Sequence, residues 1–198
     1  MSVLRRKLDL NSSVVGYIGR LAEEKGIIDF VRSLEILSGK DLKFQALIIG
    51  NGPYEKKIRR TIDNLELNSL IKIMSAVPHN EISKYYNCVD ILVVPSYTTK
   101  SWKEQFGRVL IEAMACGMPV IGSNSGEIPN IIQKTGGGLI FQERNIKDLA
   151  AKIYELLKDE RKRKKLGQRG REKVIELYSY EVVTRQFYEV YRQLLSDK

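Results

Sequence analysis

Two cations follow the first apolar run of the sequence and could bind a charged ligand. Gly19 ends that run, Arg20 comes next, and we expect Lys25 to open the following helix. A glycine permits a tight turn and a close approach of backbone to ligand. Two cations beside a helix N-terminus can neutralise a diphosphate together. The neighbouring Glu23 and Glu24 could instead offset the charge of Lys25, so both interpretations stay open.

A second group of polar residues lies between the fourth and fifth apolar runs. Gly107 is predicted to begin a helix that Gly117 ends, and Glu104 lies just before it. Glu112 falls in the apolar part of this helix, where a carboxylate needs a partner. A hydroxyl-rich ligand such as a ribose would be one partner, and a buried Arg or Lys would be the other.

The start of the same helix is a candidate phosphate site, because its first backbone N–H groups lack an intrahelical partner. These groups belong to Gly107, Arg108, Val109 and Leu110. Glu104 would reach polar groups on one side of a phosphate, and Glu112 would reach groups on the other. A sugar joined through a diphosphate to a nucleoside presents hydroxyls, phosphates and hydroxyls in this order.

These loops need a scaffold, and the apolar pattern supplies one. Short apolar runs, most of them continuously apolar, predict strands at Val14–Ile18, Phe44–Ile49, Ile71–Met74, Ile91–Val94, Pro119–Gly122 and Gly138–Phe141. Continuous apolar runs are typical of parallel strands that are buried on both faces. We therefore predict an α/β, Rossmann-like fold of three layers with a six-stranded parallel sheet. Ligands bind at the carboxyl ends of the strands in such sheets.

Amphipathic stretches between the strands predict the helices that a parallel sheet requires as crossovers. They lie at Ile27–Leu37, Tyr54–Leu65, Glu81–Asn87, Gly107–Ala115, Ile128–Gln133 and Ile146–Leu157. Two more, Glu160–Leu177 and Tyr180–Leu195, have no strand after them. No linker-like tract divides residues 1–198, so we expect a single domain.

Composition and short motifs exclude several classes of protein. No apolar run is long enough for a membrane span, and residues 1–10 lack the apolar stretch of a secretory signal, so we do not expect them to be one. Two cysteines and one histidine cannot form a Cys/His zinc site, and they favour a reducing cytosol. The loops carry neither the G-x-G-x-x-G spacing of a dehydrogenase nor a P-loop.

The net charge of +9 is consistent with an anionic partner. Much of the excess lies at Arg161–Lys165 and Arg169–Lys173, on a predicted helix. Such a run is usually a solvated helix face, and no base-stacking aromatics are interleaved with it. A basic module that binds RNA or an anionic membrane is therefore an alternative function, and nucleic acid is not the favoured partner.

Taken together, these motifs resemble the C-terminal, nucleotide-sugar-binding domain of retaining glycosyltransferase family 4, which has the GT-B fold. The resemblance rests on Arg20 and Lys25 in the first loop, the Glu104-x7-Glu112 spacing, and the run from Glu112 to Pro119. It covers the chain from about Val14 to Leu195. A sugar-nucleotide epimerase of similar build is the second alternative, although we find no catalytic acids or histidines for it.

The resemblance implies roles for individual residues. Arg20 and Lys25 would bind the donor diphosphate and stabilise the leaving group, and Glu104 would contact hydroxyls of the donor sugar. Glu112 would bind the ribose, and Val77 would border the base. Gly19 and the amides of residues 107–110 would complete the nucleotide-sugar site, while His79 receives no catalytic role.

The resemblance also implies the reaction and its partners. A hexosyl group would pass from a UDP-, GDP- or ADP-linked donor to an acceptor hydroxyl, with retained configuration and without a metal or other cofactor. The acceptor would bind mainly to an N-terminal domain that this chain lacks, so the chain alone would transfer little. The last helix, about 180–195, would cross toward that domain. We expect the whole enzyme in the cytoplasm, with peripheral membrane association as a further possibility.

Overall fold

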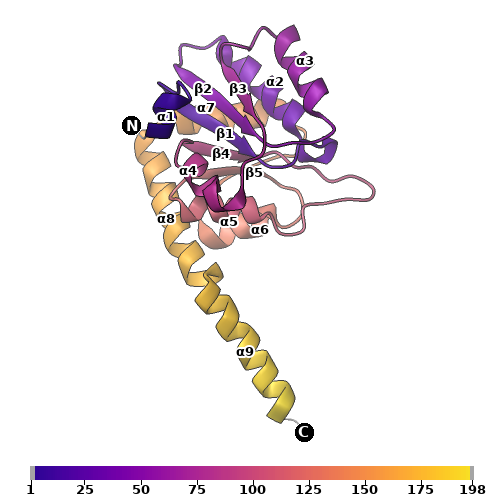
Figure 1. Cartoon of the computed structure of the whole chain (residues 1–198), viewed down its shortest axis with the longest axis vertical. Helices are drawn as coiled ribbons and strands as arrows, with labels where there is room; N and C mark the ends of the chain where they lie inside the picture. Colours follow the sequence, from indigo (N-terminus) through magenta and orange to yellow (C-terminus); the bar gives the residue numbers. More distant parts are fainter. Residues whose placement is uncertain (1–2, 197–198) are drawn as a thin grey trace.

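The computed structural model describes residues 3–196 and contains one six-stranded sheet (Figure 1). Its strands are β1 (Ser13–Ile18), β2 (Phe44–Ile49), β3 (Ile71–Met74), β4 (Ile91–Val94), β5 (Val120–Ser123) and β6 (Gly138–Phe141). All neighbouring pairs are parallel, in the order β3-β2-β1-β4-β5-β6. The order reverses between β1 and β4, so the sheet is doubly wound, which fits the predicted Rossmann-like fold.

The helices also follow the predicted pattern, with ends that differ by one or two residues at most. They are α2 (Ile27–Ser38), α3 (Glu55–Asn64), α4 (Ile82–Tyr86), α5 (Arg108–Ala115), α6 (Ile128–Thr135), α7 (Ile146–Lys158), α8 (Glu160–Tyr178) and α9 (Tyr180–Ser196). Three short elements were not predicted: α1 (Val3–Lys7) and the 3-10 helices η1 (Glu23–Lys25) and η2 (His79–Glu81).

One detail of the first loop corrects the prediction. Lys25 does not open α2; it ends η1, and Gly26 separates it from the helix. Gly26 has a φ of 66°, a left-handed conformation that glycine adopts without strain. Lys25 therefore lies before the N-cap of α2, in the segment that follows β1, and not in the first turn of that helix.

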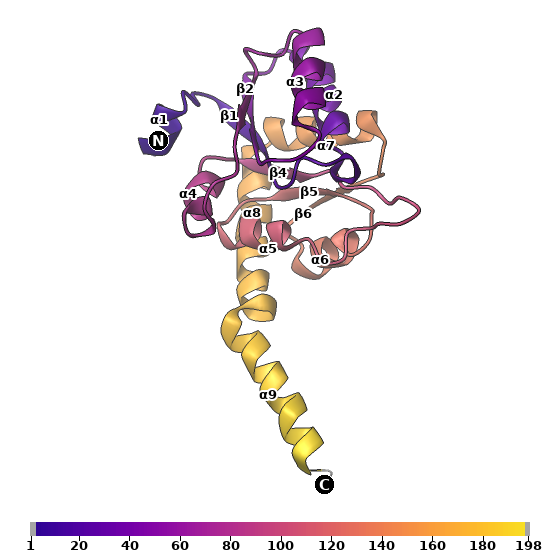
Figure 2. The same cartoon turned by 45° about the vertical axis from the view of Figure 1, so that its right-hand side comes forward.

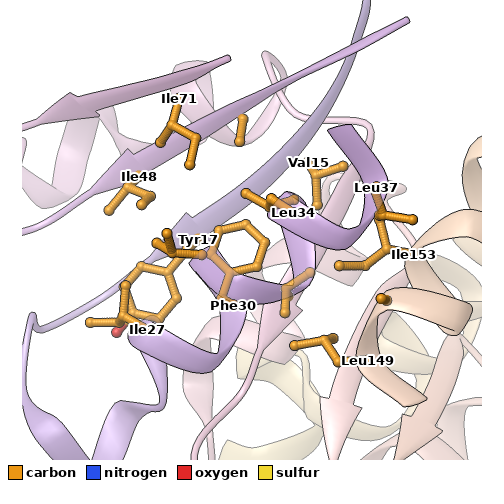
Figure 3. Packing of buried hydrophobic residues seen from close by; sticks show 14 of the residues in the cluster. Val15, Tyr17, Ile27, Phe30, Leu34, Leu37, Ile48, Ile71, Leu149 and Ile153 are labelled. Carbon is orange, nitrogen blue, oxygen red and sulfur yellow. The ribbon is translucent and has the colours of Figure 1, made fainter. Parts of the chain in front are cut away.

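The sheet is covered on both faces, which explains why most of its strands are continuously apolar. Figure 3 shows one face, where Val15 and Ile48 of the sheet pack against Phe30 of α2 and Leu149 of α7. Side chains alternate along a strand, so Val14 points to the other face, which α4, α5, α6 and α8 cover (Figures 1 and 2). The three-layer arrangement is thus confirmed.

The two C-terminal helices differ in their contact with the domain. Helix α8 packs closely on it: a Cβ on Gly167 would lie 2.1 Å from the carbonyl oxygen of Gly117. Helix α9 continues beyond the domain (Figures 1 and 2) and contributes no buried residue. Its exposed apolar side chains include Tyr180, Phe187, Tyr188, Val190, Tyr191, Leu194 and Leu195. Within residues 3–196, no helix has both the length and the apolar character to cross a membrane.

Ending the chain after Ser179 should leave the stability of the domain almost unchanged. Helix α9 buries nothing against the domain, so its loss removes no core contact. We expect the melting temperature to change by less than about 2 °C, measured by circular dichroism. Ending the chain after Asp159 instead also removes the buried Val174 of α8 and should unfold much of the protein. Equal melting curves for the two truncations would contradict this account.

Candidate functional site

Two cavities lie side by side at the carboxyl edge of the sheet. The first, here called the cation cavity, has a volume of about 220 Å³. Its lining includes Gly19, Arg20, Lys25, Ser96, Glu104, Gly107, Arg108 and Val109. The second, the apolar cavity, has a volume of about 310 Å³. It shares Ile18, Gly19 and Arg20 with the cation cavity, and its other lining residues are Ile49, Gly50, Asn51, Ala76, Val77 and Ile82.

A larger hollow of about 650 Å³ is lined by Glu23, Glu24, Trp102 and Arg144, among others. Its two carboxylates would repel a diphosphate, and Arg144 already stacks over the ring of Tyr97 at 4.1 Å. The cation cavity, in contrast, is lined by Arg20 and Lys25 of one loop and by the N-terminus of α5. We therefore take the smaller cavity as the candidate anion site.

Lys25 and Glu104 are joined in this structure. The Nζ of Lys25 donates to Oε2 of Glu104 at 2.7 Å, and their side chains are 23% and 12% exposed. Ser96 donates its hydroxyl to the same oxygen at 3.1 Å. The Lys25 ammonium also lies 4.5 Å from the ring centre of Trp102. An ammonium has three donors, so Lys25 can keep this bond and still donate to a ligand.

Close packing of two loops brings this pair together. A Cβ on Gly26 would lie 1.9 Å from the carbonyl oxygen of Pro95, so a side chain there would push the loops apart. The backbone N–H of Tyr97 donates to the carbonyl of Glu24 at 3.0 Å. The loop after β1 is thus held directly against the loop after β4, which positions Lys25 beside Glu104.

Arg20 is exposed and borders both cavities. Its carbonyl accepts a hydrogen bond from the hydroxyl of Tyr17 at 2.7 Å. Burial raises the pKa of Tyr17, so this hydroxyl stays protonated and keeps the turn in place. A Cβ on Gly50 would lie 1.8 Å from the carbonyl oxygen of Gly19. The ends of β1 and β2 therefore approach so closely that Gly50 needs to be a glycine.

The start of α5 offers three N–H groups to the cation cavity. Gly107 is the N-cap, with a φ of 69°, and no side chain caps the helix. The N–H groups of Gly107, Arg108 and Val109 have no hydrogen-bond acceptor among the described residues. The N–H of Leu110 donates to the carbonyl of Gly107 at 2.8 Å, and its side chain is buried. The expectation that Leu110 also offers a free N–H was wrong, because the first turn of α5 closes with this bond between residues three apart.

Glu112 has a partner that neither sequence interpretation named. The hydroxyl of Tyr86, at the end of α4, donates to Oε2 of Glu112 at 2.7 Å. Glu112 is half-buried and is not among the residues that line the cation cavity. Nothing in the sequence signalled this contact, because Tyr86 reads as an ordinary apolar position of an amphipathic helix.

Other residues of the site were only partly foreseen. Val77, which the sequence analysis placed beside a base, lines the apolar cavity. Asn51, which the sequence did not single out, accepts a hydrogen bond from the N–H of Ala76 at 3.0 Å and so holds that loop. His79 is exposed and lines neither cavity. Among the described residues, no three His, Cys, Asp or Glu side chains are grouped as a metal site.

The basic run on α8 is largely engaged in contacts within the protein. Arg163 donates to the carbonyl of Leu157 at 2.9 Å, and Arg171 donates to that of Ala115. Both arginines therefore satisfy carbonyls at the ends of other helices. Ion pairs use Lys162 with Glu155, Lys164 with Glu160 and Lys173 with Glu176. These contacts within the protein account for much of the basic run on α8, so the run does not by itself require an RNA or membrane partner.

The sheet order defines a Rossmann-like domain, and its likeness to solved structures assigns it to the GT-B glycosyltransferase type. Sucrose-phosphate synthase from Thermosynechococcus elongatus superposes with a TM-score of 0.85 at 30% identity, covering 98% of this chain and 49% of that one. The C-terminal domain of LpcC, a glycosyl transferase group 1 family protein from Francisella tularensis, has a TM-score of 0.78 at 26% identity, covering 88% and 91%. Anabaena HepE in complex with UDP superposes with a TM-score of 0.85 at 22% identity, covering 96% of this chain and 51% of that one.

Residues 4–173 match the family described as glycosyl transferases group 1, and the chain belongs to this family. A similar relative is the capsular polysaccharide biosynthesis glycosyltransferase CapM of Staphylococcus aureus, which is 29% identical over 96% of this chain and 49% of its own length. The chain spans about half the length of the curated relatives it matches. The resemblance inferred from the sequence is confirmed at the level of family and fold.

Proposed function

We propose that this chain is the donor-binding half of a glycosyltransferase and that it binds a nucleoside diphosphate sugar. The observation that carries the proposal is the pair of cavities joined through Gly19 and Arg20. One is basic and contains a helix N-terminus, and the other is largely apolar. A nucleotide has a charged part and a flat, weakly polar part, so the two cavities match its two ends.

The diphosphate would occupy the cation cavity. Three N–H groups at the start of α5 would bind its oxygens, with the positive end of the helix dipole behind them. Arg20 and Lys25 would add two full charges from the facing loop. These groups would also stabilise the negative charge that develops on the departing diphosphate during transfer. Arg20 and Lys25 are for this reason the proposed catalytic cations.

The remaining site residues would bind the two ends of the donor. Glu104, fixed by Lys25 and Ser96, would accept hydrogen bonds from hydroxyls of the transferred sugar. Val77 would lie beside the base in the apolar cavity. Glu112 would bind the ribose that joins base and diphosphate. The complexes of HepE with UDP and with UDP-glucose are consistent with a donor of this kind.

Transfer itself needs more than this chain in the proposed scheme. An acceptor would bind to a second domain, which would contact the exposed apolar face of α9. The transferred group would be a hexose, and its configuration would be retained without a metal or other cofactor. A cytoplasmic location, with peripheral membrane association for some acceptors, also stays a prediction. Without its partner domain the chain should bind donor weakly and show little transfer.

A nucleotide panel tests the proposal directly. Isothermal titration with UDP, GDP and ADP should show binding of at least one, and a thermal shift should accompany it. Arg20→Ala should weaken that binding about tenfold, because a charge-assisted contact to phosphate is lost. Arg60→Ala serves as the matched control, since Arg60 is an exposed arginine on α3 that lines neither cavity.

The same assay separates the alternatives. A single-stranded RNA that stabilises the protein while all three diphosphates have no effect would overturn the proposal in favour of a basic binding module. Equal losses for Arg20→Ala and Arg60→Ala would show that general charge, and not the cation cavity, governs binding.

A further inference from the structure

The contact between Tyr86 and Glu112 is a polar pair within an apolar layer. Tyr86 is 1% exposed and packs in the same cluster as Leu110 and Cys88. Its hydroxyl donates to Oε2 of Glu112 at 2.7 Å. A buried polar pair adds little stability compared with apolar side chains of similar size, although its loss on one side is costly. Packing alone therefore does not explain why this position carries a carboxylate.

The pair lies one helical turn behind both cavities. Ile82 of α4 lines the apolar cavity, and Tyr86 follows it by four residues. Arg108 of α5 lines the cation cavity, and Glu112 follows it by four residues. Residues four apart share a face of a helix. The hydrogen bond thus joins the two helices that border the two cavities, close to where a ribose would connect a base to a diphosphate.

The hydrogen bond from Tyr86 leaves one of the two carboxylate oxygens of Glu112 available to a ligand. Oε2 of Glu112 is occupied by Tyr86, whereas Oε1 has no hydrogen-bond partner among residues 3–196. Burial, and then the hydrogen bond to Glu112, raise the pKa of Tyr86. The hydroxyl therefore remains protonated and keeps donating across the working pH range. A carboxylate held by one oxygen loses rotational freedom before a ligand arrives, which lowers the entropy cost of binding.

We propose that Tyr86 is a positioning residue that fixes Glu112 so that Oε1 faces the ribose hydroxyls of the bound nucleotide. The inference rests on the proposed function, because it needs a nucleotide in the two cavities. It adds a residue on α4 to the site, one that touches no ligand and acts through Glu112. Specificity for ribose would then depend on a buried tyrosine.

The test compares a ribonucleotide with its 2′,3′-dideoxy counterpart. Isothermal titration of the wild-type chain with the best diphosphate of the panel, and with the dideoxy form, gives an affinity ratio that reports the ribose contacts alone. We expect a ratio of about 10 in the wild type, as for one good hydrogen bond to a charged group. In Tyr86→Phe the ratio should fall to about 2, with the affinity for the dideoxy form unchanged.

Further variants separate positioning from structure. Glu112→Ala should bring the ratio to about 1, whereas Tyr85→Phe should keep the wild-type ratio, because it removes a neighbouring hydroxyl that makes no bond to Glu112. Urea unfolding checks that Tyr86→Phe is folded. If that variant does not fold, the same titrations are made with Tyr86→Met, which also lacks the hydroxyl. An unchanged ratio in the Tyr86 variant, or an equal loss for both nucleotides, overturns the inference. A wild-type chain that binds no diphosphate contradicts the proposed function, and this inference with it.

Discussion

Replacing Lys25 with alanine is expected to lower the affinity for the donor nucleotide about 100-fold. Lys25 lines the cation cavity together with Arg20 and Arg108, and the loss of a full charge against a diphosphate is costly in a partly buried site. The same change leaves Glu104, with 12% of its side chain exposed, without its cation. We therefore also expect a loss of stability of about 1 kcal/mol. Isothermal titration and urea unfolding measure the two effects.

A double variant separates these two effects. In Lys25→Ala with Glu104→Gln, no uncompensated carboxylate remains, so stability should return toward the wild-type value while nucleotide affinity stays low. Lys103→Ala is the matched control, because Lys103 is an exposed lysine next to Glu104 in the loop after β4 and does not line the cation cavity. If the double variant recovered full affinity, the role of Lys25 would be limited to neutralising Glu104.

Replacing Gly26 with alanine should be among the most damaging single changes in the domain. Its φ of 66° costs a side chain about 1–2 kcal/mol. The new Cβ would lie 1.9 Å from the carbonyl oxygen of Pro95, which adds overpacking of about 1–3 kcal/mol. We expect a total loss of about 3 kcal/mol and a fall in melting temperature of about 8 °C. Donor affinity should fall as well, because the loop that carries Lys25 must shift.

Gly39→Ala is the matched control for this effect. Gly39 follows α2 with a φ of −79°, and a Cβ there meets no atom within 4 Å. This variant should be as stable as the wild type in urea unfolding, or slightly more stable, because alanine reduces the freedom of the unfolded chain. Comparable losses at both glycines would refute the argument from close loop packing.

The fold could be predicted because two independent patterns agree in this sequence. Most of the six short apolar runs, such as Ile91–Val94, are continuous because both faces of the sheet are buried, and the amphipathic stretches between them have the helical period. Their alternation leaves few topologies other than a doubly wound sheet. The short helix at Val3–Lys7 escaped prediction because it has five residues and no buried side chain, so it leaves no periodic signal.

The site could be predicted only in part, because its geometry depends on contacts between distant loops. Arg20 and Lys25 were foreseen at one cavity, since both follow β1 directly. The direct bond between Lys25 and Glu104 was not, because 79 residues separate them and the close packing at Gly26 sets their distance. The partner of Glu112 was missed for the same reason: Tyr86 lies on another helix, and its apolar ring hides its hydroxyl from pattern analysis.

The division of the binding edge into two cavities has a consequence for how relatives could acquire new donors. The apolar cavity is built by chain segments that follow β1, β2 and β3, and the cation cavity by those that follow β1 and β4; Ile18, Gly19 and Arg20 are common to both. In the proposed function, mutations around Val77 and Asn51 would alter the choice of nucleobase while the residues proposed to bind phosphate remain unchanged. Base preference would then be a trait that evolution or protein engineering could change without loss of the proposed transfer chemistry.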